Sequence, residues 1–377
     1  LAAVGVGPIF WGFLMSVDFY RSGRLFLPDG SCLAGFLSSE LRSCLVTFVR
    51  RGGWTAGDFS HVFGAKGQFI ALVWFDDVAS ACGSAAVVAD WRRDLQWSRV
   101  LDKSGQRAVL KGGEKAWWAL ADRLRRTWPL HEWEVQDQLA ADPSVSKVRD
   151  RVLSLLRKAE STAFAAEAEA LVAKAQQLQQ QYVLDGLVAE GSSAETIRTH
   201  RVCISGPYIK HRFRLLGGVA RANGCRAILV HPLGLVSVVG EPESCAHTAQ
   251  MYESLQVQCD YYMSTDPRAE QARMDKQLAP FKRSFLLAYA ARISTLLSEV
   301  NEHALPEDEV ARASAEKALA LRGTAVDRKV EDLYSNLRCS SLAVNNWSGY
   351  SAGVDAAERS RLGGAEIDAQ KSLESSA

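Results

Sequence analysis

Apolar residues recur at helical spacing in two neighbouring stripes between residues 145 and 184. The first stripe follows the spacing i, i+4, i+7, i+8 and i+11 and consists of Val148, Val152, Leu155, Leu156 and Ala159. The second stripe consists of Ala168, Leu171, Val172, Ala175, Leu178 and Tyr182. Between them lies a polar turn, in which Ser161 or Thr162 is placed to cap the second helix. A turn this short forces its two helices to lie antiparallel, so the pattern predicts a helical hairpin.

A mixed pattern of strands and helices follows the hairpin. Residues 212–223 have the periodicity of a helix that ends at Asn223-Gly224, and residues 241–263 begin a second helix with acidic residues. Residues 225–230 and 235–239 are strand-like and are joined by a His-Pro-Leu-Gly turn, which is a hairpin signal. Residues 199–204 are a further candidate strand. We therefore expect a small αββα module with a short antiparallel sheet covered by helices.

Helical periodicity also predicts helices at residues 33–49, ended by Gly52-Gly53, at residues 117–124 and at residues 284–300. The segment 53–59 looks like a turn that leads into mixed sequence. Residues 69–75 form an apolar run that fits a strand or a buried helix equally well. The charged and Ala-rich segment 307–337 predicts a solvated helix or a helix pair.

Tryptophan is unevenly distributed, since nine of the ten tryptophans precede residue 140. Such a concentration fits stacking platforms for bases or sugars, but packing in a core is the favoured interpretation because tryptophan carries a large apolar area. The predicted fold class is α+β, predominantly helical. The expected parts are a Trp-rich, mostly helical N-terminal domain (1–140), the helical hairpin (145–185), the αββα module with its following helix (197–303), C-terminal helices (304–362) and a disordered tail (363–377).

The composition, 47% hydrophobic and 23% charged, is typical of an ordinary globular protein. Eight scattered cysteines without a CxxC pair argue against a structural zinc site and are typical of reduced thiols. The apolar stretch at residues 5–17 is too short and too interrupted to span a bilayer, so we expect a soluble, cytoplasmic protein without membrane contact. The first residue is Leu1 and not Met, which leaves open whether a further N-terminal segment precedes it.

The hairpin resembles the helical module of the bacterial and phage domain-of-unknown-function family numbered 2786. The matching motifs are Leu155-Leu156, Ala159-Glu160-Ser161, Glu167-Ala168, Lys174-Ala175-Gln176 and Tyr182. Features similar to the family's usual α/β continuation follow in order, at Gly224-Cys225, Gly240, Tyr252 to Leu255, Ser284-Phe285-Leu286 and Gly349 to Gly353. The resemblance covers residues 145–360 well and the N-terminal region loosely, and it departs at Val354, where the family commonly has a basic residue. It implies an arrangement of elements and no activity, because the family has no established one.

The sharpest chemical feature is a basic window between residues 197 and 240. It contains no acidic residue and seven basic ones, namely Arg198, Arg201, Lys210, Arg212, Arg214, Arg221 and Arg226. In a chain whose net charge is only +1, this local excess is suited to binding a phosphate backbone. The simpler alternative is pairing with acidic segments elsewhere, such as residues 241–243 or 299–309.

Other chemical signals are weak. His247 follows Glu243 by one helical turn, a spacing that suits a shared metal, but no further ligand completes a known motif. Gly-rich phosphate loops and the GxSxG motif are absent, and Gly349 and Gly353 form a GxxxG pattern that indicates close helix packing. We expect a non-enzymatic protein without a cofactor that associates with nucleic acid. The alternatives are a structural or protein-interaction module that docks through the hairpin and, third, a metal-dependent hydrolase.

Overall fold

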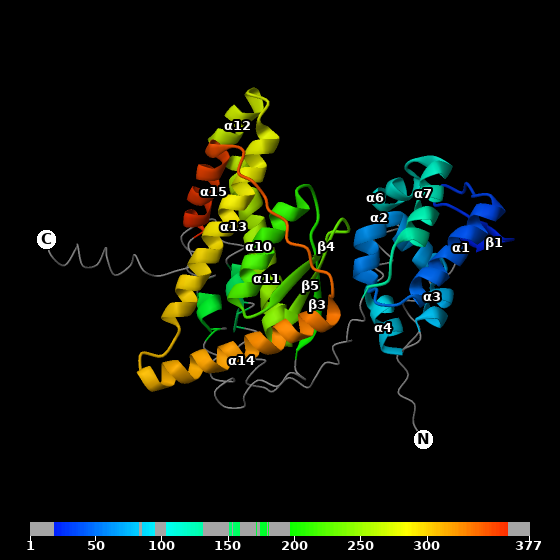
Figure 1. Ribbon diagram of the computed structural model, residues 1–377. Helices are drawn as coiled ribbons and strands as arrows, with labels where there is room; N and C mark the ends of the chain where they lie inside the picture. Colours follow the sequence, from blue (N-terminus) through cyan, green and yellow to red (C-terminus); the bar gives the residue numbers. More distant parts are fainter. Residues whose placement is uncertain are drawn as a thin grey trace, which may run out of the picture. The chain divides into compact units, whose positions relative to one another are not determined.

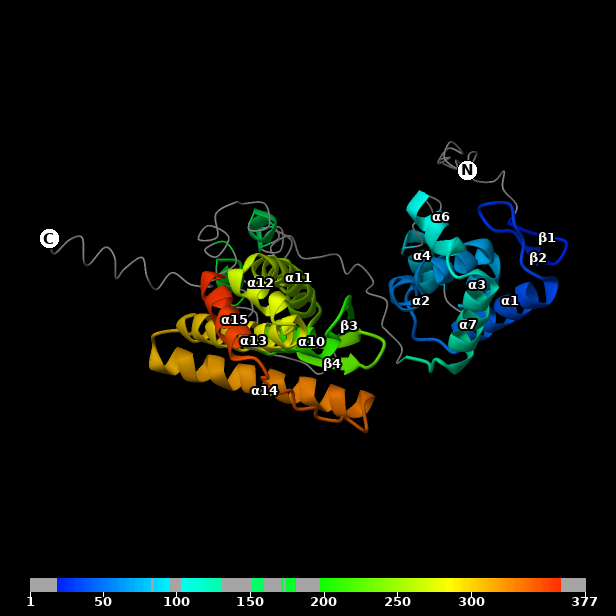
Figure 2. The same ribbon diagram turned by 90° about the horizontal axis from the view of Figure 1, so that it is seen from above.

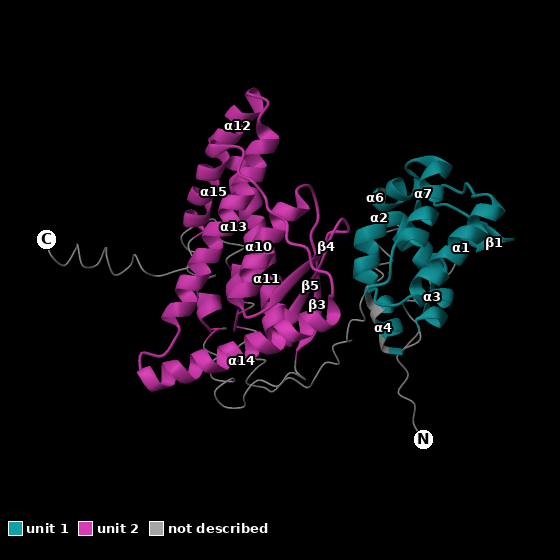
Figure 3. Cartoon of the chain, viewed as in Figure 1, with its two compact units in different colours: residues 1–135 teal, residues 136–377 magenta. Residues whose placement is uncertain are grey.

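The structure is a computed structural model that describes residues 19–82, 85–94, 103–130, 151–152, 154–158, 171, 174–178, 180 and 197–360. The chain divides into two compact units, residues 1–135 and residues 136–377 (Figure 3). Both are mostly helical, and each has one small antiparallel sheet, in agreement with the predicted α+β class. The hairpin turn at residues 160–162 and the expected disordered tail at residues 363–377 lie outside the described residues.

Unit 1 begins with a two-stranded ribbon, β1 (Tyr20–Arg21) and β2 (Arg24–Leu25), and continues as helices. The helices are α1 (Gly35–Arg50), α2 (Ala56–Val73), α3 (Phe75–Ala81), α4 (Ala85–Asp94), α6 (Lys103–Leu110) and α7 (Gly113–Arg126). Helices α1 and α7 confirm the periodicity at residues 33–49 and 117–124. The expected glycine stop after α1 is present, because Gly52 and Gly53 both have a left-handed φ, 78° and 77°.

Helix α2 corrects one interpretation of the sequence and decides between two alternatives in another. The expected turn at residues 53–59 is short, because Thr55 caps α2 through a capping box with Asp58. The ambiguous run at residues 69–75 is the end of α2 and the first residue of α3, with Trp74 as the cap between them, so its helical alternative is the correct one. Periodicity does not distinguish the two possibilities, because Phe69 and Ile70 are completely buried among apolar neighbours.

Of the six tryptophans that the structure describes in unit 1, four pack into its core. Trp54, Trp74, Trp91 and Trp117 are each less than 5% exposed. The Trp54 ring lies 4.8 Å from that of Phe48, centroid to centroid, and the Trp91 indole nitrogen donates to the Trp54 carbonyl at 3.2 Å. These four residues therefore support the packing interpretation.

Unit 2 contains the α/β module (Figure 1). Its elements are β3 (Arg198–Cys203), α10 (Ile209–Ala222), β4 (Arg226–Val230), β5 (Leu235–Gly240), α11 (Pro242–Thr265), α12 (Pro267–Met274), α13 (Leu278–His303), α14 (Glu309–Leu333) and α15 (Trp347–Arg359). The expected order of helix, two strands and helix is confirmed by α10, β4, β5 and α11, and β3 adds a third strand. The segment expected as one helix or a helix pair is the single helix α14.

The sheet has the order β3-β5-β4, with antiparallel pairing throughout. Every residue of the central strand β5 is buried. Val236 and Val238 face the main core with α10 and α11, whereas Val239 contacts Val326 and Val330 of α14 on the opposite face. Figure 2 shows α14 below the sheet and α11 above it.

Helix α13 is the centre of the helical layer, with α10 and α15 beside it. Gly349 lies against the carbonyl of Phe281, and Gly353 lies against the carbonyl of Phe285. Both approaches are so close that a Cβ on either glycine would clash with α13. On the other side of α13, a Cβ on Gly218 would lie 3.2 Å from the Cβ of Ser294. The close packing predicted from the GxxxG pattern is therefore confirmed.

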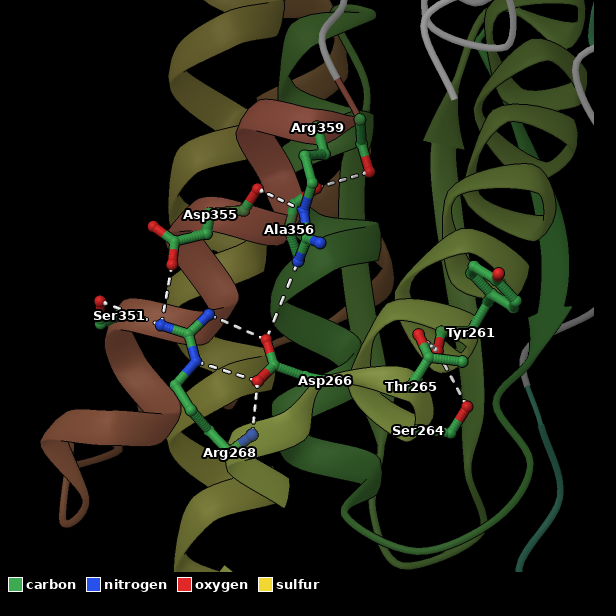
Figure 4. Close-up of polar contacts among 10 residues, drawn as sticks. Tyr261, Ser264, Thr265, Asp266, Arg268, Ser351, Asp355, Ala356 and Arg359 are labelled. Carbon is green, nitrogen blue, oxygen red and sulfur yellow. Dashed lines mark hydrogen bonds and ion pairs between the residues drawn. The ribbon is translucent and has the colours of Figure 1, made fainter. Parts of the chain in front are cut away.

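A polar junction fixes the start of α12 against α15. Asp266 is 5% exposed and caps α12 by accepting from the backbone N–H of Arg268 at 2.9 Å. The Arg268 guanidinium contacts Asp266 at 2.8 Å and Asp355 of α15 at 2.8 Å, as Figure 4 shows. Hydrogen bonds from Arg268 lower the pKa of Asp266, so this carboxylate is held in its charged form.

The described part of the hairpin packs on the α/β module. Val152, Leu156 and Ala175 are buried in the main core of unit 2, as the apolar stripes predict. Gln176 of the second hairpin helix is completely buried, and its amide nitrogen donates to the side-chain oxygens of Asn223 at 3.1 Å and Asn301 at 3.0 Å. A buried polar network therefore adds specificity to an otherwise apolar contact.

Candidate nucleic-acid interface

The seven residues of the basic window do not form one surface. Two of them, Arg198 and Arg201, lie on β3, and Arg226 lies at the start of β4. The remaining four lie on α10, namely Lys210, Arg212, Arg214 and Arg221.

Two of the arginines are engaged in ion pairs. Arg212 is 8% exposed, and its two terminal nitrogens contact the carboxylate of Asp260 on α11 at 2.9 and 2.8 Å. Arg226 pairs with Asp327 of α14 at 2.8 Å. The expectation that acidic residues neutralise part of the window therefore holds for these two. The named partner segments, 241–243 and 299–309, were wrong for both, because packing of α11 and α14 on the module brings Asp260 and Asp327 closer.

The strand arginines lie on opposite faces of the sheet. Side chains alternate between the two faces along a strand, so Arg198 and Arg201, which are an odd number of positions apart, lie on opposite faces. Arg198 is in register with Gly240 on the face of the main core, whereas Arg201 is in register with Ser237 on the other face. Both side chains are partly buried, so β3 does not present them as a common phosphate-binding pair.

The other three residues form a continuous row along α10. Lys210, Arg214 and Arg221 occupy positions i, i+4 and i+11, which share one side of a helix, and Gly217 fills position i+7. Arg214 and Arg221 are exposed, and a Cβ on Gly217 would meet no atom within 4 Å. We refer to Lys210, Arg214 and Arg221 as the α10 basic stripe.

A further cation, Arg283 of α13, lies near His211 at the start of α10. Burial lowers the pKa of His211, and the positive charges of Arg283 and Arg214 lower it further. Both guanidinium groups therefore lie close enough to His211 to disfavour its protonation. Sequence analysis missed Arg283 because it is remote from the basic window in the chain. The available signal was Lys282-Arg283 in a stretch, residues 278–298, that contains no acidic residue.

Two of the described segments beside α10, residues 278–298 of α13 and residues 334–346, contain no acidic residue. Thr295 and Ser298 are exposed on α13, and the first acidic residue of that helix, Glu299, lies 3.6 Å from Arg292. The connecting segment 334–346 contacts both helices and contains no acidic residue. Its Ser340 carbonyl accepts from Arg214 at 2.9 Å, and Ser284 of α13 accepts from the backbone of Asn345 at 3.1 Å.

The remaining candidates do not form a site for chemistry in the part of the chain that the structure describes. His247 is buried, and its Nε2 lies 3.0 Å from the side-chain oxygen of Gln176. Among the described residues, histidine, cysteine and acidic side chains form no group of three or more that could hold a metal ion. The described apolar positions of the hairpin contact the core of unit 2, so any docking of a partner requires other faces of the hairpin.

A family model described as Protein of unknown function (DUF2786) matches residues 147–185. The match covers the helical hairpin, which is a small region of the chain, and agrees with the resemblance found in its motifs. Comparison with curated proteins returned no match, and comparison with solved structures returned none. Within the described ranges, none of the helices has the length and the apolar character needed to cross a lipid bilayer.

Proposed function

We propose that this protein binds nucleic acid through phosphate contacts made by the α10 basic stripe and Arg283. The observation that carries the proposal is the row of Lys210, Arg214 and Arg221 on one side of α10, in which Arg214 and Arg221 are exposed. Cations in such a row suit a polyanion, because each can replace a counterion condensed on the phosphate backbone. The contacts would be largely independent of base sequence, since phosphates carry no sequence information directly.

The arrangement of α10 strengthens this interpretation. No acidic residue lies in its first turn, so the positive end of the helix dipole adds to the charge of Lys210. Gly217 leaves space in the middle of the stripe, where a bulky side chain would keep a backbone away from Arg214 and Arg221. Because the whole chain has a net charge of only +1, attraction would be local to this surface.

The test is a measurement of DNA and RNA binding as a function of salt concentration. The stripe variant changes Lys210, Arg214 and Arg221 to Ala together. Arg212 is left intact, because its removal would leave Asp260 without its partner and would confuse binding with folding. We expect weaker binding and a salt slope reduced by roughly one for each phosphate that the variant can no longer neutralise.

A control variant removes the same number of charges elsewhere in unit 2. It changes Arg273, Lys317 and Arg328 to Ala, all of which are exposed on α12 or α14. The control should bind with an unchanged slope. Absence of binding by the unmodified chain, or equal slopes for the stripe variant and the unmodified chain, would overturn the proposal.

A further inference from the structure

Trp347 is the most unusual aromatic residue of unit 2. It is the only tryptophan after residue 135, and it is 76% exposed. Its ring is stacked on that of Tyr350, with centroids 5.2 Å apart and an interplanar angle of 14°. One face of the indole is therefore covered by Tyr350, and the high exposure leaves the opposite face open to solvent.

The position of this ring is fixed by its backbone. Trp347 is the first residue of α15, and the side chain of Asn346 caps that helix by accepting from Gly349 at 2.7 Å. The backbone N–H of Asn346 donates to Ser284 of α13 at 3.0 Å. Since the tyrosine also supports the indole, little conformational entropy would be lost when another flat ring stacks on it.

The same contacts connect the segment that leads to the aromatic pair with the proposed phosphate surface. Ser284 is the neighbour of Arg283 on α13, and the segment that leads to Trp347 also contacts Arg214 through Ser340. In Figure 1 this segment runs past α10 toward the start of α15. Between residues 333 and 354 the chain has no acidic residue, so no negative charge of that stretch separates the ring from the cations.

We infer that the ligand is a single-stranded nucleic acid whose backbone follows the α10 basic stripe and Arg283 and whose base stacks on the open face of Trp347. This inference rests on the proposed function and names its ligand class. In a duplex the base faces are already stacked on one another, so only an unpaired base offers a face to an exposed indole. Proteins that bind single strands combine these two features, a basic path and an aromatic platform.

The binding experiment uses the full chain with an oligothymidylate of about 16 nucleotides and with a duplex of the same length. Trp347→Ala should weaken binding of the single strand by about ten-fold, the effect of losing one stacked base, and should leave duplex binding and the salt slope unchanged. Trp347→Tyr should restore most of the lost affinity, because a smaller aromatic face remains. Trp128→Ala, at a tryptophan that is 47% exposed in unit 1, is the matched control.

A spectroscopic readout follows the ring itself. In a chain labelled with 5-fluorotryptophan, the ¹⁹F signal missing from Trp347→Phe belongs to Trp347, and this signal should shift when oligothymidylate is added. If Trp347→Ala binds the single strand normally while the stripe variant does not, the stacking inference fails and the proposed function stands. If neither single strand nor duplex binds the unmodified chain, the proposed function fails and the inference fails with it.

Discussion

The stability of unit 2 should fall when His247 becomes protonated. His247 is 3% exposed on α11, and burial lowers its pKa to about 4 from an ordinary value of 6.5. The oxygen of Gln176 accepts from Nε2, because the amide nitrogen of Gln176 already donates to two asparagines. Within the described part of the chain Nδ1 has no hydrogen-bond partner, so a second proton there would be buried and unsatisfied.

The direction and the size of this pH-dependent loss of stability follow from the linkage between proton binding and folding. The folded pKa of His247 lies below the unfolded value, so the unfolded chain binds more protons between pH 6.5 and pH 4. The free energy of unfolding is therefore unaffected by His247 above this window and falls as the pH decreases through it. The two pKa values give a decrease of about 2 kcal/mol between pH 7 and pH 5, and of about 3 kcal/mol by pH 4.

The assay compares the unmodified chain with His247→Gln, which keeps a side chain able to donate to Gln176. Urea unfolding is measured at each pH by pulsed hydrogen exchange in peptides from α11, which report on unit 2 separately from unit 1. Burial also lowers the pKa of His200 and His211, so both curves contain their contribution and only the difference belongs to His247.

We expect the curve of His247→Gln to be flatter by about 2 kcal/mol between pH 7 and pH 5. The same substitution at exposed His303 is the control for removal of one histidine. Parallel curves for His247→Gln and the unmodified chain would refute the reasoning, because they would mean that folding does not exclude the proton from this site.

Three further predictions concern packing and helix caps. Asp266→Ala should lower the free energy of unfolding by about 1 kcal/mol more than Asp266→Asn in urea titrations at pH 7, because Asn retains the cap on α12. Hydrogen bonds from Arg268 lower the pKa of Asp266. The stability that the Asp266 carboxylate contributes should therefore be present above about pH 4 and lost below it. Gly353→Ala should destabilise unit 2 by about 1–3 kcal/mol in thermal denaturation, because the added Cβ would clash with α13. Gly217→Ala places its Cβ in open space and should be neutral or stabilising. Equal melting temperatures for the two variants would contradict the close packing of α13 and α15. Thr55→Ala should cost unit 1 about 1 kcal/mol through removal of its capping box, measured by hydrogen exchange in α2.

The sequence predicted those features that are encoded within a few residues of each other. Helical periodicity located α1, α10 and α13, and the glycine spacing at residues 349 and 353 anticipated the close approach to α13. The capping pattern of Thr55 and Asp58 is equally local and was available, but it was interpreted as part of a turn. The ambiguity at residues 69–75 had a different cause, because full burial removes the polar positions that reveal periodicity.

The candidate site depended on interactions between distant parts of the chain, and these were not predictable from local patterns. The helix expected at residues 212–223 contains Arg214 and Arg221, and α10 begins earlier, at Ile209, so that it also includes Lys210. The basic window did not reveal that Arg212 faces Asp260, which lies 48 residues further on, or that Arg283 of another helix lies near His211. A run of charged residues in a sequence forms a charged surface only where the side chains remain exposed after packing.

The buried side chain of Gln176 has a consequence for how this chain folds. Its partners lie 47 and 125 residues later, and the second of them follows all three strands of the module and helix α11 in the sequence. The second hairpin helix therefore cannot complete its hydrogen bonds until α10 and α13 have formed, which makes its docking a late, non-local step. The described residues of the segment that matches the family model therefore pack against elements that lie far along the chain. A fragment limited to residues 147–185 would lack the asparagines that satisfy its buried amide, and the smallest independently stable piece of unit 2 should extend through α15.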